Sequence, residues 1–212
     1  MQFPDAAILV FAKAPISGEV KTRLIPTLGV EHATRLHARL VRHTLATAMQ
    51  ASICPVQLWC APDSAHLFFA ECQRDFGVSL HTQQGNDLGA RMAHAFKSTL
   101  QQHSQVVIIG SDCPLLTQHD FFTAVDALSN GCDAVLGPAQ DGGYVLLGLN
   151  HPAPAMFENI PWGTADVLAL TRERLQQLQW PVRELTEHWD VDRPEDLAHP
   201  FMQKLLLEIK PE

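Results

Sequence analysis

Residues 6–24 read AAILVFAKAPISGEVKTRL, and this stretch decides the fold. The run Ala6–Phe11 is continuously apolar, which is the pattern of a parallel strand with both faces buried. A loop punctuated by Pro15 and Gly18 follows, and it carries three cations, Lys13, Lys21 and Arg23. Because ligands gather at the carboxyl ends of strands in open α/β sheets, we expect this loop to belong to a binding site.

Short apolar runs alternate with longer segments of helical periodicity along the rest of the chain. The predicted strands after the first are 56–60, 78–82, 106–109, 134–136, 144–149, 182–185 and 189–191. The predicted helices are 31–50, 64–76, 88–101, 117–128 and 164–178, with a final helix that starts at Pro194. The residues TQHD (117–120) resemble a capping box at the start of the helix 117–128. This order predicts a three-layer α/β fold with a mostly parallel sheet. Since no repeat or Gly/Ser linker interrupts the chain, we expect a single domain over residues 1–212.

The composition excludes several classes of protein. Of the 212 residues, 46% are hydrophobic and 18% are charged, which supplies a core and is unlike a disordered chain. The formal net charge of −8 argues against nucleic acid as the main partner. The apolar runs fall far short of the roughly 20 residues that cross a bilayer. Residues 1–5 lack the basic start of a signal peptide, so we expect a cytoplasmic protein without a membrane span.

Charge is divided unevenly along the chain. Residues 1–106 carry 9 basic and 7 acidic side chains, whereas residues 107–212 carry 6 and 16, so the two halves have net charges of +2 and −10. This division predicts that the N-terminal half binds phosphates and that the acidic half binds a divalent metal. The alternative, a solvated acidic surface, is the better account for most of the acidic side chains.

The cationic loop after the first strand has the chemistry of a phosphate-binding loop. Exposed amides, the ammonium groups of Lys13 and Lys21 and the guanidinium of Arg23 all complement polyphosphate oxygens, and Gly18 lies in the same loop. The loop is neither GxGxxG nor a Walker A sequence, because Val20 stands where Walker A requires Gly. We expect Lys21 and Arg23 to stabilise phosphate charge during a reaction. The alternative is a solvated turn.

Three aspartates are candidates for a metal site. Asp112 follows the apolar run 106–109, and a carboxylate at such a strand end can bind Mg²⁺ that bridges phosphate oxygens. Asp190 and Asp192 lie at i and i+2 of a short extended segment and therefore on one face. The alternative for Asp192 is a cap on the final helix, since Asp is a favoured capping residue.

The loop QQGNDLGARM (83–92) follows the third predicted strand and opens a helix. Gln84 can hydrogen-bond the edge of a base there, and Arg91 can contact phosphate. Gly85 and Gly89 lie between these two side chains. We therefore take these four residues as candidates for nucleotide binding.

Two Gly-containing motifs have the character of walls of an acceptor pocket. DGGY (141–144) carries Asp141, and PWGT (161–164) carries Trp162 and Thr164. Glycine admits a close approach, and the aromatic side chains offer faces for a sugar or a base. We expect Asp141 to take part in catalysis. The alternative for each motif is a turn beside a core aromatic.

Six motifs together resemble a small bacterial family of GT-A-type, nucleotide-diphospho-sugar transferase-like proteins that includes arsenosugar-biosynthesis-type glycosyltransferases. The motifs are FAKAPISGEVKTRL, QGNDLGARM, GSDCPLL, GPAQDGGYVLLGL, IPWGT and WDVDRPEDL, and they extend from about Ala7 to Leu197. The resemblance implies a Rossmann-like sheet that binds a nucleotide at its strand ends, with Asp112 in the position of the fold's metal-binding aspartate. The ending VDRPEDL is also similar to the (V/I)DTPEDL ending of sugar nucleotidyltransferases, which implies that Asp192 is a metal ligand. Arg193 replaces the usual Thr of that ending.

The resemblance leaves two reactions open. Glycosyltransferases of this fold typically move a sugar from a nucleoside diphosphate sugar, whereas nucleotidyltransferases attack the α-phosphate of a nucleoside triphosphate and release pyrophosphate. The loop with Lys21 and Arg23 looks more like that of the second group, which includes phospholactate guanylyltransferases, while the naming of the family favours the first. We expect a Mg²⁺- or Mn²⁺-dependent, glycosyltransferase-like enzyme that uses a nucleotide sugar and a small-molecule acceptor, ahead of a nucleotidyltransferase. A non-catalytic nucleotide-sugar-binding protein is the alternative of another class.

Overall fold

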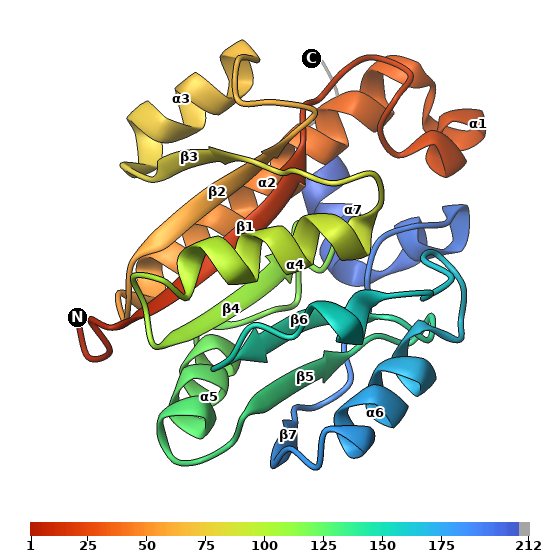
Figure 1. Ribbon diagram of the computed structural model, residues 1–212. Coiled ribbons are helices and arrows are strands. Elements are labelled where there is room, and N and C mark those ends of the chain that lie inside the picture. Colours follow the sequence, from red (N-terminus) through yellow and green to blue (C-terminus); the bar gives the residue numbers. More distant parts are fainter. Residues whose placement is uncertain (208–212) are drawn as a thin grey trace.

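Strand β1 (Ala6–Lys13) lies near the middle of a seven-stranded sheet with the order β3-β2-β1-β4-β6-β5-β7 (Figure 1). The computed structural model describes residues 1–207. The other strands are β2 (Val56–Ala61), β3 (Ser79–Thr82), β4 (Gln105–Gly110), β5 (Ala134–Pro138), β6 (Tyr144–Leu149) and β7 (Val182–Glu184). Only β6 runs against its neighbours in this sheet, so the mostly parallel sheet is confirmed.

The apolar run in β1 is continuous because the strand feeds two cores. Every residue from Ala6 to Ala12 is buried, and β1 is flanked by the parallel strands β2 and β4. Ile8 and Val10 point into one core, while Leu9 and Phe11 point into the other. In a strand with one solvated face, apolar and polar residues alternate, and β1 lacks this alternation.

Helices cover both faces of the sheet. One core is closed by α2 (Val30–Ala51), α3 (Leu67–Phe76) and α5 (Gln118–Ser129), and the other by α4 (Leu88–Thr99), the 3-10 helix η2 (Pro154–Phe157) and α6 (Val167–Gln177). In Figure 1, α4 lies in front of the sheet and α2 behind it. The expected three layers are confirmed. No helix within residues 1–207 is long and apolar enough to cross a membrane.

A third, smaller cluster joins residues 24–40 to residues 189–206. Leu24 follows the cationic loop in the short helix η1 (Thr22–Leu24), which leads into α1 (Ile25–Leu28). Leu24 packs with Leu36 and Leu40 of α2 and with Val191, and all four side chains are fully buried. Leu197 of η3 (Pro194–Ala198) and residues of α7 (Pro200–Leu207) complete the cluster. This packing brings the loop before Leu24 against the acidic segment around Val191.

Four expected elements differ from the structure. Helix α6 begins at Val167, three residues after the expected start at 164. The prediction of a strand over 189–191 is wrong, because in this region only His188 forms a bridge, with Ala139, and the next residues leave the sheet. Helix α3 begins three residues later than expected, since the His66 ring accepts a hydrogen bond from the Phe68 amide and caps the helix. The expected final helix at Pro194 is a 3-10 turn that is followed by α7.

Helix α5 begins with the expected capping box. The Asp120 carboxylate accepts hydrogen bonds from the Thr117 amide at 2.8 Å and the Thr117 hydroxyl at 2.7 Å. Its other oxygen lies 3.3 Å from Nε2 of His188, and both of these side chains are largely buried. One carboxylate therefore both starts α5 and anchors the segment that leads to Val191.

We expect Asp120→Asn to lower the free energy of unfolding by about 1 to 3 kcal/mol near neutral pH. Burial opposes ionisation of this carboxyl, but hydrogen bonds from His188 and Thr117 outweigh it and lower the pKa of Asp120 from 3.8 to about 2. Because the pKa is lower in the folded state, the stabilisation is present above about pH 4 and is lost as the pH falls toward 2. Urea titrations at about pH 7 and about pH 3 measure the effect. An equal difference between the two proteins at both pH values would contradict this role.

Candidate functional site

The carboxyl ends of β1 and β4 carry the central pair of the site. The two strands are parallel neighbours, with Phe11 opposite Gly110, so the loops that follow them begin side by side. The ammonium of Lys21 lies 2.7 Å from Oδ1 of Asp112 and also donates a hydrogen bond to the Val191 carbonyl. The Lys21 side chain is only 5% exposed, whereas that of Asp112 is 50% exposed. The predicted phosphate-binding lysine is therefore paired with the predicted metal-binding aspartate.

A second ion pair lies beside the first. Arg23 binds the Asp192 carboxylate, and both side chains are solvent-accessible, at 61% and 39% exposure. The alternative that Asp192 caps the last helix is not supported. The carboxylate at that turn is Asp196, which accepts hydrogen bonds from the amides of Asp192, at 2.8 Å, and Arg193.

The aspartates share one electrostatic environment. Burial and the negative charges of Asp141 and Asp112 raise the pKa of Asp190 to about 6. Burial also tends to raise the pKa of Asp112. The charges of the Lys21 ammonium and, secondarily, of His37 outweigh this effect and lower the pKa of that carboxyl. A second cation among these carboxylates would relieve the repulsion at Asp190.

A cavity of about 390 Å³ is lined by both members of the Arg23–Asp192 pair, whereas Lys21 and Asp112 do not line it. Five predicted site residues line it: Arg23, Asp141, Thr164, Asp190 and Asp192. Trp189 and Arg193 also line it, and the sequence analysis did not select them. Residues far apart in the sequence thus form one concave polar surface at the carboxyl edge of the sheet.

The two Gly-containing motifs meet at this cavity. In the turn 141–143, the Asp141 carboxylate accepts a hydrogen bond from the Gly143 amide at 2.8 Å. Gly142 has a φ of +87°, and a Cβ at this position would lie 2.3 Å from the carbonyl oxygen of Ala165. The turn can pack against the loop 163–166 only because Gly142 has no side chain.

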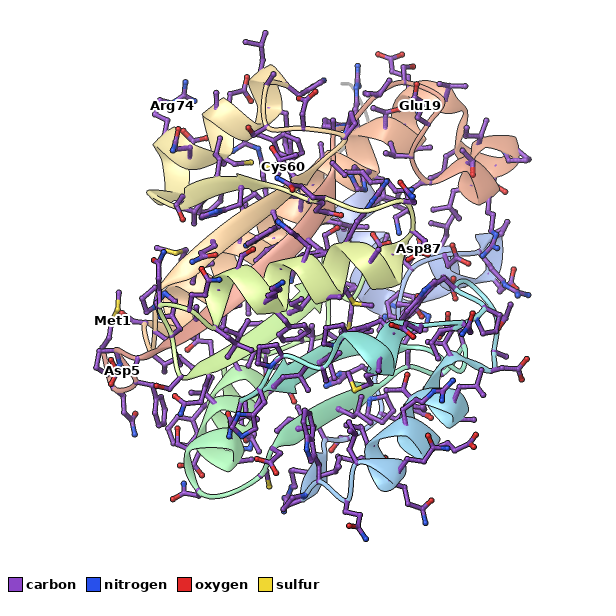
Figure 2. All side chains as sticks on the ribbon, viewed as in Figure 1. Met1, Asp5, Glu19, Cys60, Arg74 and Asp87 are labelled. Atoms are coloured by element: carbon purple, nitrogen blue, oxygen red, sulfur yellow. The ribbon has the colours of Figure 1, made fainter. Side chains whose placement is uncertain are left out.

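The start of α4 contacts Trp162, the residue that precedes the loop 163–166. Asp87 caps α4 by accepting a hydrogen bond from the Ala90 amide at 2.8 Å, and Nε of Arg91 donates to the Gly85 carbonyl at 3.1 Å. The Trp162 indole covers Gly89 so closely that a Cβ on Gly89 would lie 2.7 Å from the ring. In Figure 2, Asp87 lies at the opposite edge of the sheet from Met1.

We expect Gly89→Ala to cost about 1 to 3 kcal/mol of stability, because the added methyl group overlaps the Trp162 ring. Alanine is the better helix former by about 1 kcal/mol, so a net loss would show that the contact with Trp162 prevails. Gly110→Ala is the matched control: nothing lies within 4 Å of its Cβ position, and its change should stay within about 0.5 kcal/mol. Urea unfolding measures both variants. Equal stabilities for the two would contradict close packing of Trp162 on Gly89.

Four predicted residues do not contact the Lys21–Asp112 pair. Lys13, Gly18, Gln84 and Gly85 are exposed, and in the described part of the chain no hydrogen bond or ion pair joins them to the Lys21–Asp112 pair. The neighbouring Gln83 is structural, since its side chain donates to the Trp59 carbonyl at 2.8 Å. The position of Gln84 leaves its amide accessible to a ligand.

Two further residues, which no motif in the sequence identifies as functional, shape the site. His37 on α2 is buried and contacts the Lys13 carbonyl at 2.9 Å, and burial lowers the pKa of its imidazole. Asp196 holds the segment 189–193 through its contacts with two backbone amides and, at 3.0 Å, with the Trp189 indole. The only signal in the sequence was the position of Asp196 two residues after Pro194, which suits a capping box.

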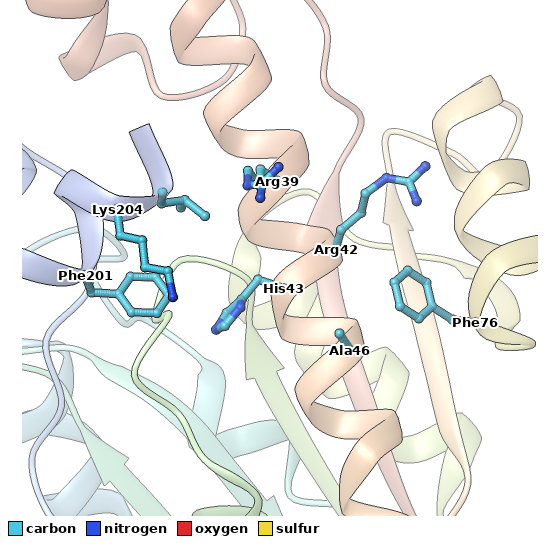
Figure 3. Close-up of a pocket in the computed structure, with 8 residues that line it drawn as sticks. Arg39, Arg42, His43, Ala46, Phe76, Phe201 and Lys204 are labelled. Carbon is cyan, nitrogen blue, oxygen red and sulfur yellow. The ribbon is translucent and has the colours of Figure 1, made fainter. Parts of the chain in front are cut away.

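A larger cavity of about 450 Å³ lies elsewhere, on α2 between α3 and α7 (Figure 3). Arg42, His43, Phe76 and Lys204 are among the residues that line it, and none of the predicted site residues do. The charge of Arg42 is already balanced by Glu71 at 2.9 Å and Asp75 at 2.7 Å. The smaller cavity is therefore the better candidate for the functional site.

The expected metal ligands are not arranged as a preformed site. Within residues 1–207, no group of three or more His, Cys, Asp or Glu side chains is positioned to hold a metal ion. Lys21 and Arg23 occupy the carboxylates of Asp112 and Asp192. The donor chemistry nevertheless fits Mg²⁺, because Oδ1 of Asp112 is buried without a hydrogen bond of good geometry and Asp190 offers a second hard oxygen ligand.

Comparisons with known proteins agree with this architecture. Residues 44–164 match the family described as "Uncharacterized protein conserved in bacteria (DUF2064)". A phosphoenolpyruvate guanylyltransferase from Chloroflexus aggregans (strain MD-66 / DSM 9485) is 31% identical over 142 residues, which are 65% of this chain and 69% of the relative.

Two crystal structures are similar over nearly the whole chain. A protein from Desulfovibrio desulfuricans G20, provisionally named a nucleotide-diphospho-sugar transferase, is 28% identical with a TM-score of 0.82, and the match covers 99% of this chain and 100% of the other. The 4-diphosphocytidyl-2C-methyl-D-erythritol synthase from Anaerococcus prevotii DSM 20548 is 12% identical, with a TM-score of 0.63 and coverage of 96% and 99%, which is a likeness of fold alone. The expected Rossmann-like, nucleotide-diphospho-sugar transferase fold and the transferase class are confirmed.

Proposed function

Because the chain belongs to the bacterial family DUF2064, which has the nucleotide-diphospho-sugar transferase fold, we propose that it is a nucleotidyltransferase. It would join the nucleoside monophosphate part of a nucleoside triphosphate to a small acceptor and release pyrophosphate. The observation that carries this proposal is the Lys21–Asp112 pair, whose charges act on Asp190 in the wall of the cavity that also contains Asp141. Groups suited to phosphate, metal and acceptor would then work close to one another.

Two observations favour nucleotidyl over glycosyl transfer, which reverses the order expected from the motifs. The relative with 31% identity is a guanylyltransferase. The loop before Leu24 carries Lys13, Lys21 and Arg23, and three cations suit a triphosphate better than a diphosphate whose charge Mg²⁺ can largely neutralise. Glycosyl transfer remains the second candidate, because the Desulfovibrio structure that matches the whole chain carries the name of a nucleotide-diphospho-sugar transferase.

In the proposed reaction, an oxygen of the acceptor attacks the α-phosphorus of the nucleotide. The bond from this phosphorus to the oxygen that bridges to the β-phosphate breaks, and pyrophosphate leaves with that electron pair. Lys21 and Arg23 would bind the β- and γ-phosphate oxygens and stabilise the charge that develops on them. Asp112 and Asp190 would hold Mg²⁺, which neutralises phosphate charge when bound.

The remaining predicted residues have roles that follow from their positions. Gln84, beside Gly85, would hydrogen-bond the base, and Arg91 would support this loop through the Gly85 carbonyl. Trp162 would hold the same region in place through its contact with Gly89. Asp141 and Thr164 would face the acceptor, because both line the cavity.

A binding screen tests the substrate class. We would measure thermal stabilisation by GTP, CTP, ATP and UTP and by representative nucleoside diphosphate sugars, each with and without Mg²⁺. A ligand at 100 times its dissociation constant adds about 2.7 kcal/mol of stability. We expect one triphosphate with Mg²⁺ to stabilise the protein most. Stabilisation by diphosphate sugars alone would favour glycosyl transfer instead.

A further inference from the structure

The Lys21 ammonium contacts the same carboxylate, Asp112, that would bind the metal ion in the proposed function. It is 2.7 Å from Oδ1 of Asp112, and its side chain is 5% exposed, so water does not separate the two charges. Oδ1 is buried and accepts no hydrogen bond of good geometry from any residue in 1–207. The closest positive charge to this oxygen is therefore an internal lysine.

The position of the ammonium is determined from both sides. The Val191 carbonyl accepts a hydrogen bond from it, and Val191 is fully buried in the cluster that also contains Leu24. The backbone of Lys21 is left-handed, with a φ of 49°, a conformation that side-chain-bearing residues adopt only when their surroundings impose it. Lys21 is thus built into the site and is not a surface cation that happens to lie nearby.

An ammonium and a divalent ion cannot both contact the same carboxylate oxygen at this distance without strong repulsion. A bound triphosphate reduces this repulsion, because its charged oxygens offer Lys21 new partners and can themselves bind the metal ion. The ammonium can then leave Asp112 without losing its counter-charge.

From this geometry we propose that Lys21 blocks divalent-metal binding at Asp112 in the free protein and releases the carboxylate when the nucleotide's phosphates bind. Metal then enters together with the nucleotide and not before it. The inference rests on the proposed function, in which Asp112 is a metal ligand. It adds that the phosphate-binding lysine also controls the order in which the ligands bind.

The test uses Mn²⁺ alone as the probe, without nucleotide or acceptor. Electron paramagnetic resonance of free Mn²⁺ gives its dissociation constant for the wild type and for Lys21→Met, which keeps the length of the side chain but removes its charge. We expect Lys21→Met to bind Mn²⁺ about tenfold more tightly or better, which corresponds to about 1.4 kcal/mol. Unchanged Mn²⁺ affinity would overturn the proposal.

Two control variants show whether the gain comes from this contact. Lys97→Met removes an exposed lysine charge that does not line the cavity, and its effect should stay within about threefold, as for a screened surface charge. The double variant Lys21→Met/Asp112→Asn should lose the gain. An equal gain in Lys97→Met, or a gain that survives loss of the Asp112 charge, would contradict the proposed contact.

Two separate measurements, Mn²⁺ affinity and pyrophosphate release, distinguish this inference from the proposed function. If Lys21→Met does not fold, as judged by circular dichroism, Lys21→Gln replaces it, because an amide can still donate to the Val191 carbonyl. Pyrophosphate release by the wild type with unchanged Mn²⁺ affinity in the variants would leave the function standing and reject the block. Tighter Mn²⁺ binding in Lys21→Met, together with no pyrophosphate release by the wild type, would support the block and reject the proposed function.

Discussion

Asp112→Asn should lower turnover by about 10²- to 10³-fold, the usual cost of removing one group that stabilises charge in a transition state. The amide is nearly the same size as the carboxylate, but it carries no charge for a metal or for Lys21. Because the side chain is half-exposed and Lys21 keeps its hydrogen bond to the Val191 carbonyl, we expect the protein to remain folded. Initial rates and urea unfolding, measured on the same preparation, give the two quantities.

Asp126→Asn is the matched control for this variant. It makes the same chemical change on α5, where the carboxylate accepts a hydrogen bond from Asn130 at 3.0 Å and does not line the cavity. Its turnover should equal that of the wild type. If Asp112→Asn were as active as the control, Asp112 would not belong to the reaction centre.

Lys21→Ala should weaken nucleotide binding more than Arg23→Ala. Hydrogen bonds to charged groups contribute about 1.5 to 3 kcal/mol, and we place Lys21 near the upper end of this range and Arg23 near the lower end. The reason is burial: the Lys21 side chain is almost completely shielded from water, whereas that of Arg23 is mostly exposed. Water screens the charge of Arg23 more strongly.

Isothermal titration calorimetry with the nucleotide that stabilises the protein best measures these affinities. Arg35→Ala is the control, because it removes an exposed arginine whose partner, Glu31, is on the same helix. It should not change the affinity. Equal affinities for the wild type, Lys21→Ala and Arg23→Ala would mean that these two cations do not bind the phosphates of the nucleotide.

The sequence predicts most of the fold because its apolar patterns are strong. The run Ala6–Phe11 identifies a strand buried on both faces, and the capping box at Thr117 correctly identifies the start of α5. The segment 189–191 was predicted wrongly as a strand because Trp189-Asp190-Val191-Asp192 alternates apolar and acidic residues, as strands do. Its conformation is instead determined by tertiary contacts with Lys21 and Asp196.

The sequence also predicts which loops form the site, but not which side chains pair within it. Asp112 and Lys21 both follow predicted parallel strands, so their position at the same edge of the sheet is predictable, whereas the pairing of β1 with β4 is seen only in the structure. The pairing of Arg23 with Asp192, in contrast, depends on the packing of Leu24 against Val191, which no local pattern encodes. The close contact between Gly89 and Trp162 is equally nonlocal.

Radiolabelled GTP tests nucleotidyl transfer most directly. The GTP carries the label at either the α- or the γ-phosphate, and the labelled product is identified after turnover. Phosphoenolpyruvate is the first acceptor to try, since it is named for the guanylyltransferase that this chain resembles. Nucleotidyl transfer predicts that the α-label moves to the acceptor and that the γ-label appears in pyrophosphate. Absence of pyrophosphate from GTP, CTP, ATP and UTP, together with release of a nucleoside diphosphate from a nucleotide sugar, would contradict the account.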